Sequence, residues 1–178
     1  MLSDMKQKYT GAKTVTNSWR IPIVYRRVEF KAKYLIDYGC GKYTDHIRKH
    51  VESFGVHYIP YDPYNQPSVI NNKMAEIIAE CISRNEAIDV VCSNVLNVIA
   101  EDHIVQKIAD FLMMIANRTG GTVYVTVKFD KRYGKGVIRP DQYQRNVPIE
   151  EYLRFFPGAT ILYRVLKYEG GKADADAQ

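Results

Sequence analysis

The chain of 178 residues has the size of one globular domain and is too short for two ordinary ones. Its content of 46% hydrophobic and 25% charged residues excludes a disordered, collagen-like or low-complexity protein for the body of the chain. The net charge is +5, yet residues 1–33 carry eight basic against two acidic side chains, and residues 128–145 carry six against two. These two stretches could form one basic face if the fold brings them together.

Targeting and membrane signals are missing from the sequence. No apolar run reaches the roughly 18 to 20 residues that a membrane-spanning helix needs, and residues 1–10 lack the apolar stretch of a signal peptide. The three cysteines, Cys40, Cys81 and Cys92, are widely spaced and lie among apolar residues, which is typical of reduced, packed thiols. We therefore expect a cytoplasmic protein without membrane contact.

Strand-like and helix-like segments alternate from residue 34 onward. An apolar run at 34–38 stops at a glycine-rich turn and predicts a buried strand. Residues 44–54 place their apolar side chains on one helical face, with Thr44 as the expected N-cap and Gly55 as the stop. A second strand at 56–61 completes a β-α-β unit, whose two strands should be parallel.

The alternation continues to the end of the chain. Apolar spacing of three and four predicts helices at 74–82 and 104–115, and strands are expected at 89–92 and 122–129. Residues 130–146 have the polar, glycine-containing pattern of a loop. The remaining expected elements are a helix starting at 147–152 and ended by Pro157 and Gly158, a last strand at 160–168, and a flexible tail at 170–178.

This order of elements predicts an α/β protein with a doubly wound, mostly parallel sheet between two helical layers. Residues 1–169 should form a single domain, because no linker or internal repeat divides them, and the basic segment 1–33 should pack on it. Ligands of such sheets bind beyond the carboxyl ends of the strands, so the residues that follow each strand are the candidates for a site.

Two of these positions together indicate a pocket for an adenosine-containing ligand. Gly39 and Gly41 let the backbone approach a ligand closely, and the helix after them presents N–H groups and its positive dipole end. Asp62 follows the second strand about twenty residues later, where an acid can accept both hydroxyls of a ribose. Nicotinamide and flavin sites use G-x-G-x-x-G, but the third glycine position is occupied by Thr44, which disfavours a nicotinamide oxidoreductase.

Residues 35–42, LIDYGCGK, resemble the first motif of class I S-adenosylmethionine-dependent methyltransferases, which is a hydrophobic run followed by D-x-G-x-G. The resemblance covers roughly residues 34–129 and is to compact proteins of phages and bacteria. It implies a Rossmann-like fold, S-adenosylmethionine as cofactor and methyl transfer as the activity. The cofactor-binding residues implied by the resemblance are Asp37, Gly39, Cys40 and Gly41 at the methionine end, Asp62 with Pro63 at the ribose, and Ser93, Asn94 and Val95 beside the methyl donor.

The sequence departs from the family pattern at two places. Tyr43 stands where the glycine motif usually has a third small residue. Only about thirty residues separate Asp62 from Ser93, so the third strand of the family is missing or reduced to residues 68–71.

Residues 130–146 should lie over the pocket, where an acceptor substrate would sit, because loops of this length often form lids or binding elements. The candidate substrate-side residues are Tyr133, Arg139, Gln144 and Asn146. The acceptor itself is not specified by the sequence, although the two basic stretches make nucleic acid a possible partner. His46 and His50 are four residues apart on a helix without a third ligand, so no metal site is predicted.

An alternative of another class is a protein that binds S-adenosylmethionine or nucleic acid without transferring a methyl group. It would keep the adenosine pocket or the basic face, and a test of turnover would separate it from an enzyme.

Overall fold

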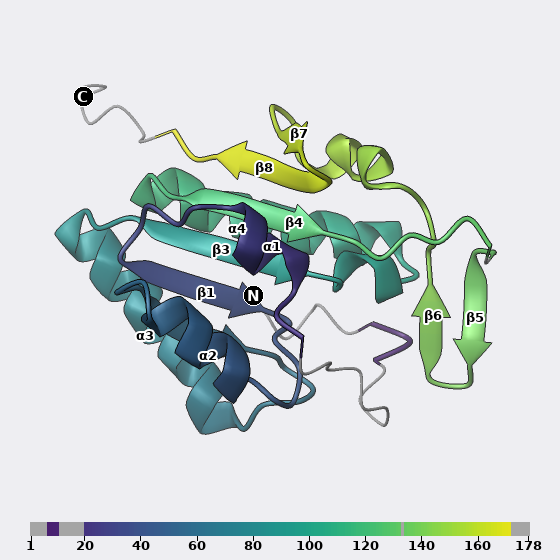
Figure 1. Ribbon diagram of the computed structural model, residues 1–178, viewed down its shortest axis with the longest axis horizontal. Helices are drawn as coiled ribbons and strands as arrows, with labels where there is room; N and C mark the ends of the chain where they lie inside the picture. The colour runs from purple at the N-terminus through teal and green to yellow at the C-terminus, as the bar shows by residue number, and fades with distance from the viewer. Residues whose placement is uncertain (1–6, 11–19, 133, 172–178) are drawn as a thin grey trace.

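The computed structural model describes residues 7–10, 20–132 and 134–171, and its largest feature is a six-stranded sheet in the order β2-β1-β3-β4-β8-β7 (Figure 1). The first four strands along the chain are parallel, whereas β8 is antiparallel to β4 and β7 is antiparallel to β8. The predicted α/β architecture with a mostly parallel sheet is therefore confirmed. The strands are β1 (Tyr34–Tyr38), β2 (His57–Tyr61), β3 (Ile88–Ser93), β4 (Thr122–Thr126), β7 (Thr160–Leu162) and β8 (Val165–Glu169).

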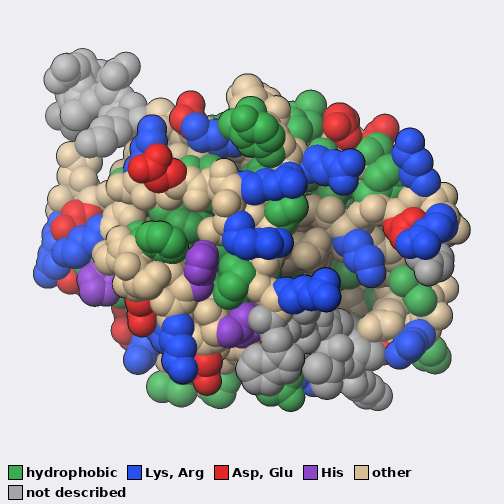
Figure 2. Space-filling model, viewed as in Figure 1, with side chains coloured by type: hydrophobic (Ala, Val, Ile, Leu, Met, Phe, Trp, Pro, Cys, Tyr) green, Lys and Arg blue, Asp and Glu red, His purple; other side chains and the backbone are tan. Residues whose placement is uncertain are grey.

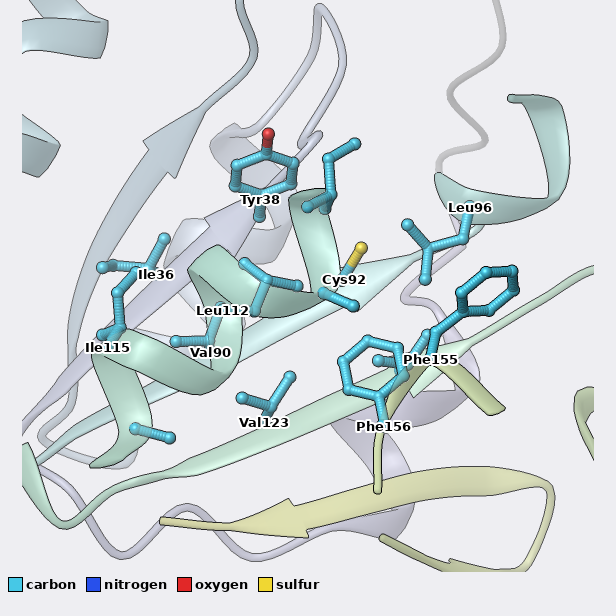
Figure 3. Close-up of a cluster of buried hydrophobic side chains, with 14 of the residues drawn as sticks. Ile36, Tyr38, Val90, Cys92, Leu96, Leu112, Ile115, Val123, Phe155 and Phe156 are labelled. Atoms are coloured by element: carbon cyan, nitrogen blue, oxygen red, sulfur yellow. The ribbon is translucent and has the colours of Figure 1, made fainter. Parts of the chain in front are cut away.

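Helices cover both faces of this sheet. The helical elements are α1 (Ile23–Arg27), α2 (Asp45–Glu52), α3 (Ser68–Arg84), α4 (Asp102–Thr119) and the short 3-10 helices η2 (Leu96–Val98) and η3 (Ile149–Phe155). Successive side chains of a strand point to opposite faces, so Leu35 packs with α1 and α2, while Ile36 packs with α3, α4 and η3. Figure 3 shows the second of these layers, with Leu112 of α4 beside Val90 and Val123 of the central strands.

A second, two-stranded antiparallel sheet stands beyond the carboxyl ends of the parallel strands (Figure 1). Its strands are β5 (Gly136–Arg139) and β6 (Gln142–Gln144). The expectation that 130–146 is only a loop is thus wrong. Both strands are short and their side chains are half-buried or exposed, so they lack the alternation of buried and exposed residues by which a strand is recognised in a sequence.

Three local predictions also need correction. Residues 68–71 are not a reduced third strand, because α3 begins at Ser68, six residues before the predicted helix. The segment 160–168 is not one strand but a hairpin of β7 and β8. Thr44 precedes α2, yet its side chain makes no capping hydrogen bond.

The start of α3 is fixed by side-chain bonds that helical periodicity does not show. Asn71 accepts a hydrogen bond from the Asp62 N–H at 2.9 Å and donates to the carbonyls of Asp62 and Gln66. These bonds hold the first turn of α3 against the end of β2.

Parts of the predicted terminal segments lie outside the described residues. In the basic segment 1–33 these are 1–6 and 11–19, and in the tail they are 172–178. No helix in the described part of the chain is long and apolar enough to cross a membrane.

Candidate functional site

A cavity of about 890 Å³ lies at the carboxyl ends of the parallel strands. In the sheet, β2 lies on one side of β1, and β3 and β4 lie on the other side. The direction in which successive strands are added therefore reverses between β1 and β3. Ligands of open α/β sheets bind at such a point. All nine residues that the sequence places around a cofactor line this cavity: Asp37, Gly39, Cys40, Gly41, Asp62, Pro63, Ser93, Asn94 and Val95.

The glycine turn after β1 is tied to the end of β2. The N–H of Gly39 donates to the Tyr61 carbonyl at 2.7 Å, and the N–H of Gly41 donates to the Asp62 carboxylate at 3.0 Å. Gly39 has φ +78°, and a Cβ at this position would lie 2.3 Å from Cγ2 of Val95. Glycine is therefore required here by conformation and by the close approach of the loop that follows β3.

The Asp62 carboxylate organises the backbone around it. The side chain is 6% exposed and accepts hydrogen bonds from the N–H groups of Gly41, Tyr64 and Asn65 at 2.9 to 3.0 Å. A fourth donor is the side-chain amide of Asn65, at 3.1 Å from Oδ2. A carboxylate offers about four acceptor positions, so the four described donors fill the acceptor positions of Asp62.

Asp37 is a buried carboxyl group on the wall of the cavity. It is 3% exposed and accepts a hydrogen bond of 2.5 Å from the Tyr58 hydroxyl. Burial raises the pKa of Asp37 to about 6, although the hydrogen bond from Tyr58 opposes the rise. The hydroxyl of the buried Tyr25 lies beside the same carboxyl group, and its interaction with Asp37 also opposes the rise in the pKa of Asp37.

The loop after β3 is fixed against the end of β4. Ser93 and Thr126 share a hydrogen bond of 3.0 Å between their hydroxyls, and the N–H of Asn94 donates to the Thr126 carbonyl at 2.8 Å. Asn94 has φ +59° and is exposed, which is a conformation that asparagine tolerates better than most residues. The loop therefore presents Asn94 and Val95 to the cavity from a rigid base.

A chain of amide hydrogen bonds joins this loop to the β5–β6 hairpin. Gln144 donates from Nε2 to the Lys128 carbonyl at 2.9 Å, and Asn97 donates from Nδ2 to Oε1 of Gln144 at 3.2 Å. A carbonyl can only accept, so the Lys128 carbonyl determines which way both amides point. The consequence is that Oδ1 of the buried Asn97 is left without a described partner on the wall of the cavity.

Residues 7–10 lie along the same cavity, next to the hairpin. The Gln7 N–H donates to the Tyr64 hydroxyl at 3.3 Å, and the rings of Tyr9 and Tyr143 stack with their centroids 5.8 Å apart. Gln7, Tyr9 and Thr10 contribute to the cavity lining. The cavity is therefore enclosed by residues 7–10 and by the β5–β6 hairpin as well as by the strand ends.

The four predicted substrate-side residues are not placed together. Gln144 lines the cavity, whereas Arg139 is exposed on β5 and is not among its lining residues. Asn146 forms two hydrogen bonds of 2.8 Å with the backbone of Asp130 and so closes the base of the hairpin segment. Tyr133 lies outside the described residues.

Sequence reasoning missed two residues of this region. Asn97 lines the cavity and lies four positions after Ser93. The sequence could have indicated it, because it belongs to the segment at the end of β3 that already carries three of the candidate residues. Arg145 belongs to the basic stretch 128–145, for which the sequence predicts a possible exposed basic face, yet it is 3% exposed. Its guanidinium donates to the Ile99 carbonyl at 2.6 Å and pairs with Asp102 at 2.5 Å, which anchors the end of the hairpin to the start of α4.

No protein-family model matches this sequence, and no curated protein matches it either.

Proposed function

We propose that the chain is a Rossmann-like methyltransferase that binds S-adenosylmethionine in the cavity at the carboxyl ends of β1, β2 and β3. One observation carries the proposal. Three separate stretches that resemble successive cofactor-binding segments of the class I family contribute residues to one cavity. The volume of about 890 Å³ lies within the roughly 300 to 1,000 Å³ of typical ligand pockets, which leaves space for the cofactor and for part of an acceptor.

Asp37 is suited to hold the amino group of the methionine part. No described Lys or Arg side chain forms an ion pair with it, so its negative charge is not compensated within the described part of the chain. An ammonium group placed beside this carboxylate would favour the charged form that burial disfavours. Cofactor binding should therefore stabilise the ionised Asp37.

Asp62 can bind a ribose by exchanging one hydrogen-bond donor for another. Three of its four donors are backbone N–H groups, which hold the loop, and the fourth is the Asn65 side-chain amide. Rotation of the Asn65 side chain would free an acceptor position for a ribose hydroxyl without disturbing the backbone. In this proposal, the Asn65 side-chain amide lies where a ribose hydroxyl would bind to Asp62.

The bound cofactor supplies a sulfonium methyl group that is already activated for transfer. The protein then has to hold the nucleophile in line with the methyl carbon, and positioning of this kind can supply most of the rate enhancement. Gln144 and Asn97 are the residues proposed for this role, because their amides are fixed by the Lys128 carbonyl and both line the cavity.

Calorimetry with matched ligands tests the cofactor assignment. The protein should bind S-adenosylhomocysteine and not NAD. Asp37→Asn should weaken S-adenosylhomocysteine about 10- to 100-fold, because a charge-assisted hydrogen bond is lost. Binding of 5′-methylthioadenosine, which has no amino-acid part, should not change. Asp45→Asn, an exposed substitution that does not face the cavity, is the control.

Two results would contradict the assignment. The first is binding of NAD without binding of S-adenosylmethionine by the unmodified protein. The second is an equal loss of affinity for both adenosine ligands in Asp37→Asn, which would give Asp37 a structural role only.

A turnover assay separates the enzyme from a protein that only binds the cofactor. Release of S-adenosylhomocysteine should be measured with nucleic acid, protein and small-molecule fractions as acceptors. Gln144→Leu should slow release by about tenfold or more while cofactor affinity stays nearly unchanged, since small positioning errors are costly in rate. Absence of release with every fraction would favour the binding protein.

A further inference from the structure

The turn between β7 and β8 has an unfavourable backbone conformation for its residues. Leu162 pairs with Val165, so Tyr163 and Arg164 form a two-residue turn, and both have positive φ, at 52° and 65°. Two-residue hairpin turns with positive φ at both positions strongly prefer Asn-Gly or similar pairs. Bulky residues in this conformation cost stability, and such strain is commonly retained where the side chains have a function.

Packing of the two side chains does not explain why they are present. Tyr163 is 68% exposed, and its neighbour Leu162 is 58% exposed. Arg164 is exposed as well. The turn therefore holds an aromatic ring and a guanidinium group out toward solvent.

The turn is held at the carboxyl edge of the sheet, the edge that carries the cavity. Val125 of β4 pairs with Leu166 in an antiparallel register, so Tyr163 and Arg164 lie beyond Thr126, the last residue of β4. Val165 packs in the same buried cluster as Val24 of α1, and Arg27 at the end of α1 donates to the Tyr163 carbonyl at 2.5 Å. The turn and α1 therefore form one continuous surface.

This surface is basic. Figure 2 shows Lys and Arg side chains spread across the face of the molecule that carries α1 and β8. Arg20, Arg26 and Lys128 are exposed and also line the cavity. The acidic residues of the cavity lining are the buried Asp37 and Asp62 and the half-buried Asp141, so positive charge dominates its exposed part.

We propose that the surface formed by Arg26, Arg27, Tyr163 and Arg164 binds single-stranded nucleic acid and leads it to the cavity. Arginines next to an exposed aromatic ring provide phosphate contacts and a stacking platform for a base, which is the combination that binds single strands with little sequence preference. Bases of a duplex are already stacked on each other and do not offer a free face to Tyr163. This inference rests on the proposed function, because it names single-stranded nucleic acid as the class of methyl acceptor.

Fluorescence polarisation without S-adenosylmethionine tests the proposal, with two labelled 20-nucleotide probes, oligo(dT) and oligo(U). The full chain should bind both oligomers more tightly than a duplex of equal length at low salt. Affinity should fall with salt at a log–log slope of roughly −0.7 for each phosphate contacted. Arg27→Gln and Arg164→Gln should each make this slope shallower.

Substitutions of the turn separate stacking from folding. Tyr163→Phe should retain affinity, while Tyr163→Ala should weaken it by about tenfold. The double variant Tyr163→Asn with Arg164→Gly should raise the melting temperature, because it relieves the strained turn, and should lose most oligomer binding. Phe54→Ala removes a ring that is 67% exposed beyond the end of α2, at the amino edge of the sheet, and should leave binding unchanged.

The outcomes distinguish this inference from the proposed function. Oligomer binding that depends on Tyr163 but occurs in a protein that does not bind S-adenosylmethionine would support the surface and refute the methyltransferase. Failure of the unmodified chain to bind any oligomer at low salt, or unchanged binding in the double variant, would overturn the inference and favour a protein partner for this surface.

Discussion

Replacement of Asp37 by Asn should stabilise the protein at neutral pH and not in acid. The carboxyl group is 3% exposed and its pKa is raised from 3.8 to about 6, mainly by burial. At low pH the group is protonated in the folded and the unfolded chain, and burial of its charge costs nothing. As pH rises from 3.8 to about 6, the unfolded chain loses the proton first, so stability falls across this range.

The size of the effect follows from the two pKa values. A difference from 3.8 to about 6 corresponds to about 3 kcal/mol, most of which develops between pH 4 and pH 7.5. Asn avoids this cost because it remains neutral. Its carbonyl can accept the hydrogen bond from Tyr58, and its amide group has the nearby Tyr25 hydroxyl as an acceptor. The advantage of Asp37→Asn over the parent should therefore grow by about 2 to 3 kcal/mol over this pH range.

Urea unfolding of both proteins at pH 4 and pH 7.5 measures this change, and the other titrating groups cancel in the difference. Tyr58→Phe is the companion variant. It removes the hydroxyl that favours the charged form of Asp37, so it should destabilise the protein more at pH 7.5 than at pH 4. A free-energy difference between parent and Asp37→Asn that is the same at both pH values would refute the reasoning, since the buried carboxylate would then ionise at no cost.

Two further predictions concern the framework of the site. Gly39→Ala should lower the free energy of unfolding by about 1 to 3 kcal/mol, because the methyl group meets Val95 at 2.3 Å in a positive-φ conformation. Adding Val95→Ala should recover part of this loss in thermal unfolding, and no recovery would show that Val95 is not the obstacle. Arg145→Met should cost about 2 to 4 kcal/mol, because the Ile99 and Ala100 carbonyls lose their buried donor. Arg154→Met removes an exposed partner of the same Asp102 and should cost less than about 1 kcal/mol, so equal losses for the two arginines in urea unfolding would contradict the importance of burial.

The parallel part of the fold could be predicted because its signals are local. Buried parallel strands are short apolar runs, so 34–38, 56–61 and 89–92 correspond closely to β1, β2 and β3. The apolar stripe of 104–115 marks the middle of α4 in the same way. Helix α1 escaped prediction because its five residues are too few to show a helical period.

The candidate site was predictable to the same extent. Residues that directly follow a strand in a doubly wound sheet must lie at one edge, so the order of Asp37, Gly39, Asp62 and Ser93 along the chain was enough to place them around one cavity. The internal hydrogen bonds of Asp62 could not be seen in this way. They depend on how the turn after β2 folds back on the glycine turn.

The sequence by itself determined the parallel strands and most of helices α3 and α4, because their apolar patterns depend on neighbours within a few residues. It determined the position of the cavity through the rule that residues following parallel strands lie at one edge of the sheet. Only the tertiary structure decided that Arg145 is buried, that Asn97 meets Gln144, and that Tyr163 is strained and exposed beside α1. These contacts join residues 43 to 136 positions apart. The sequence around a polar side chain does not reveal its distant partner, because the same Arg, Asn or Gln is compatible with a solvated surface and with a buried hydrogen bond. Which of the two occurs is decided by the packing of the whole sheet.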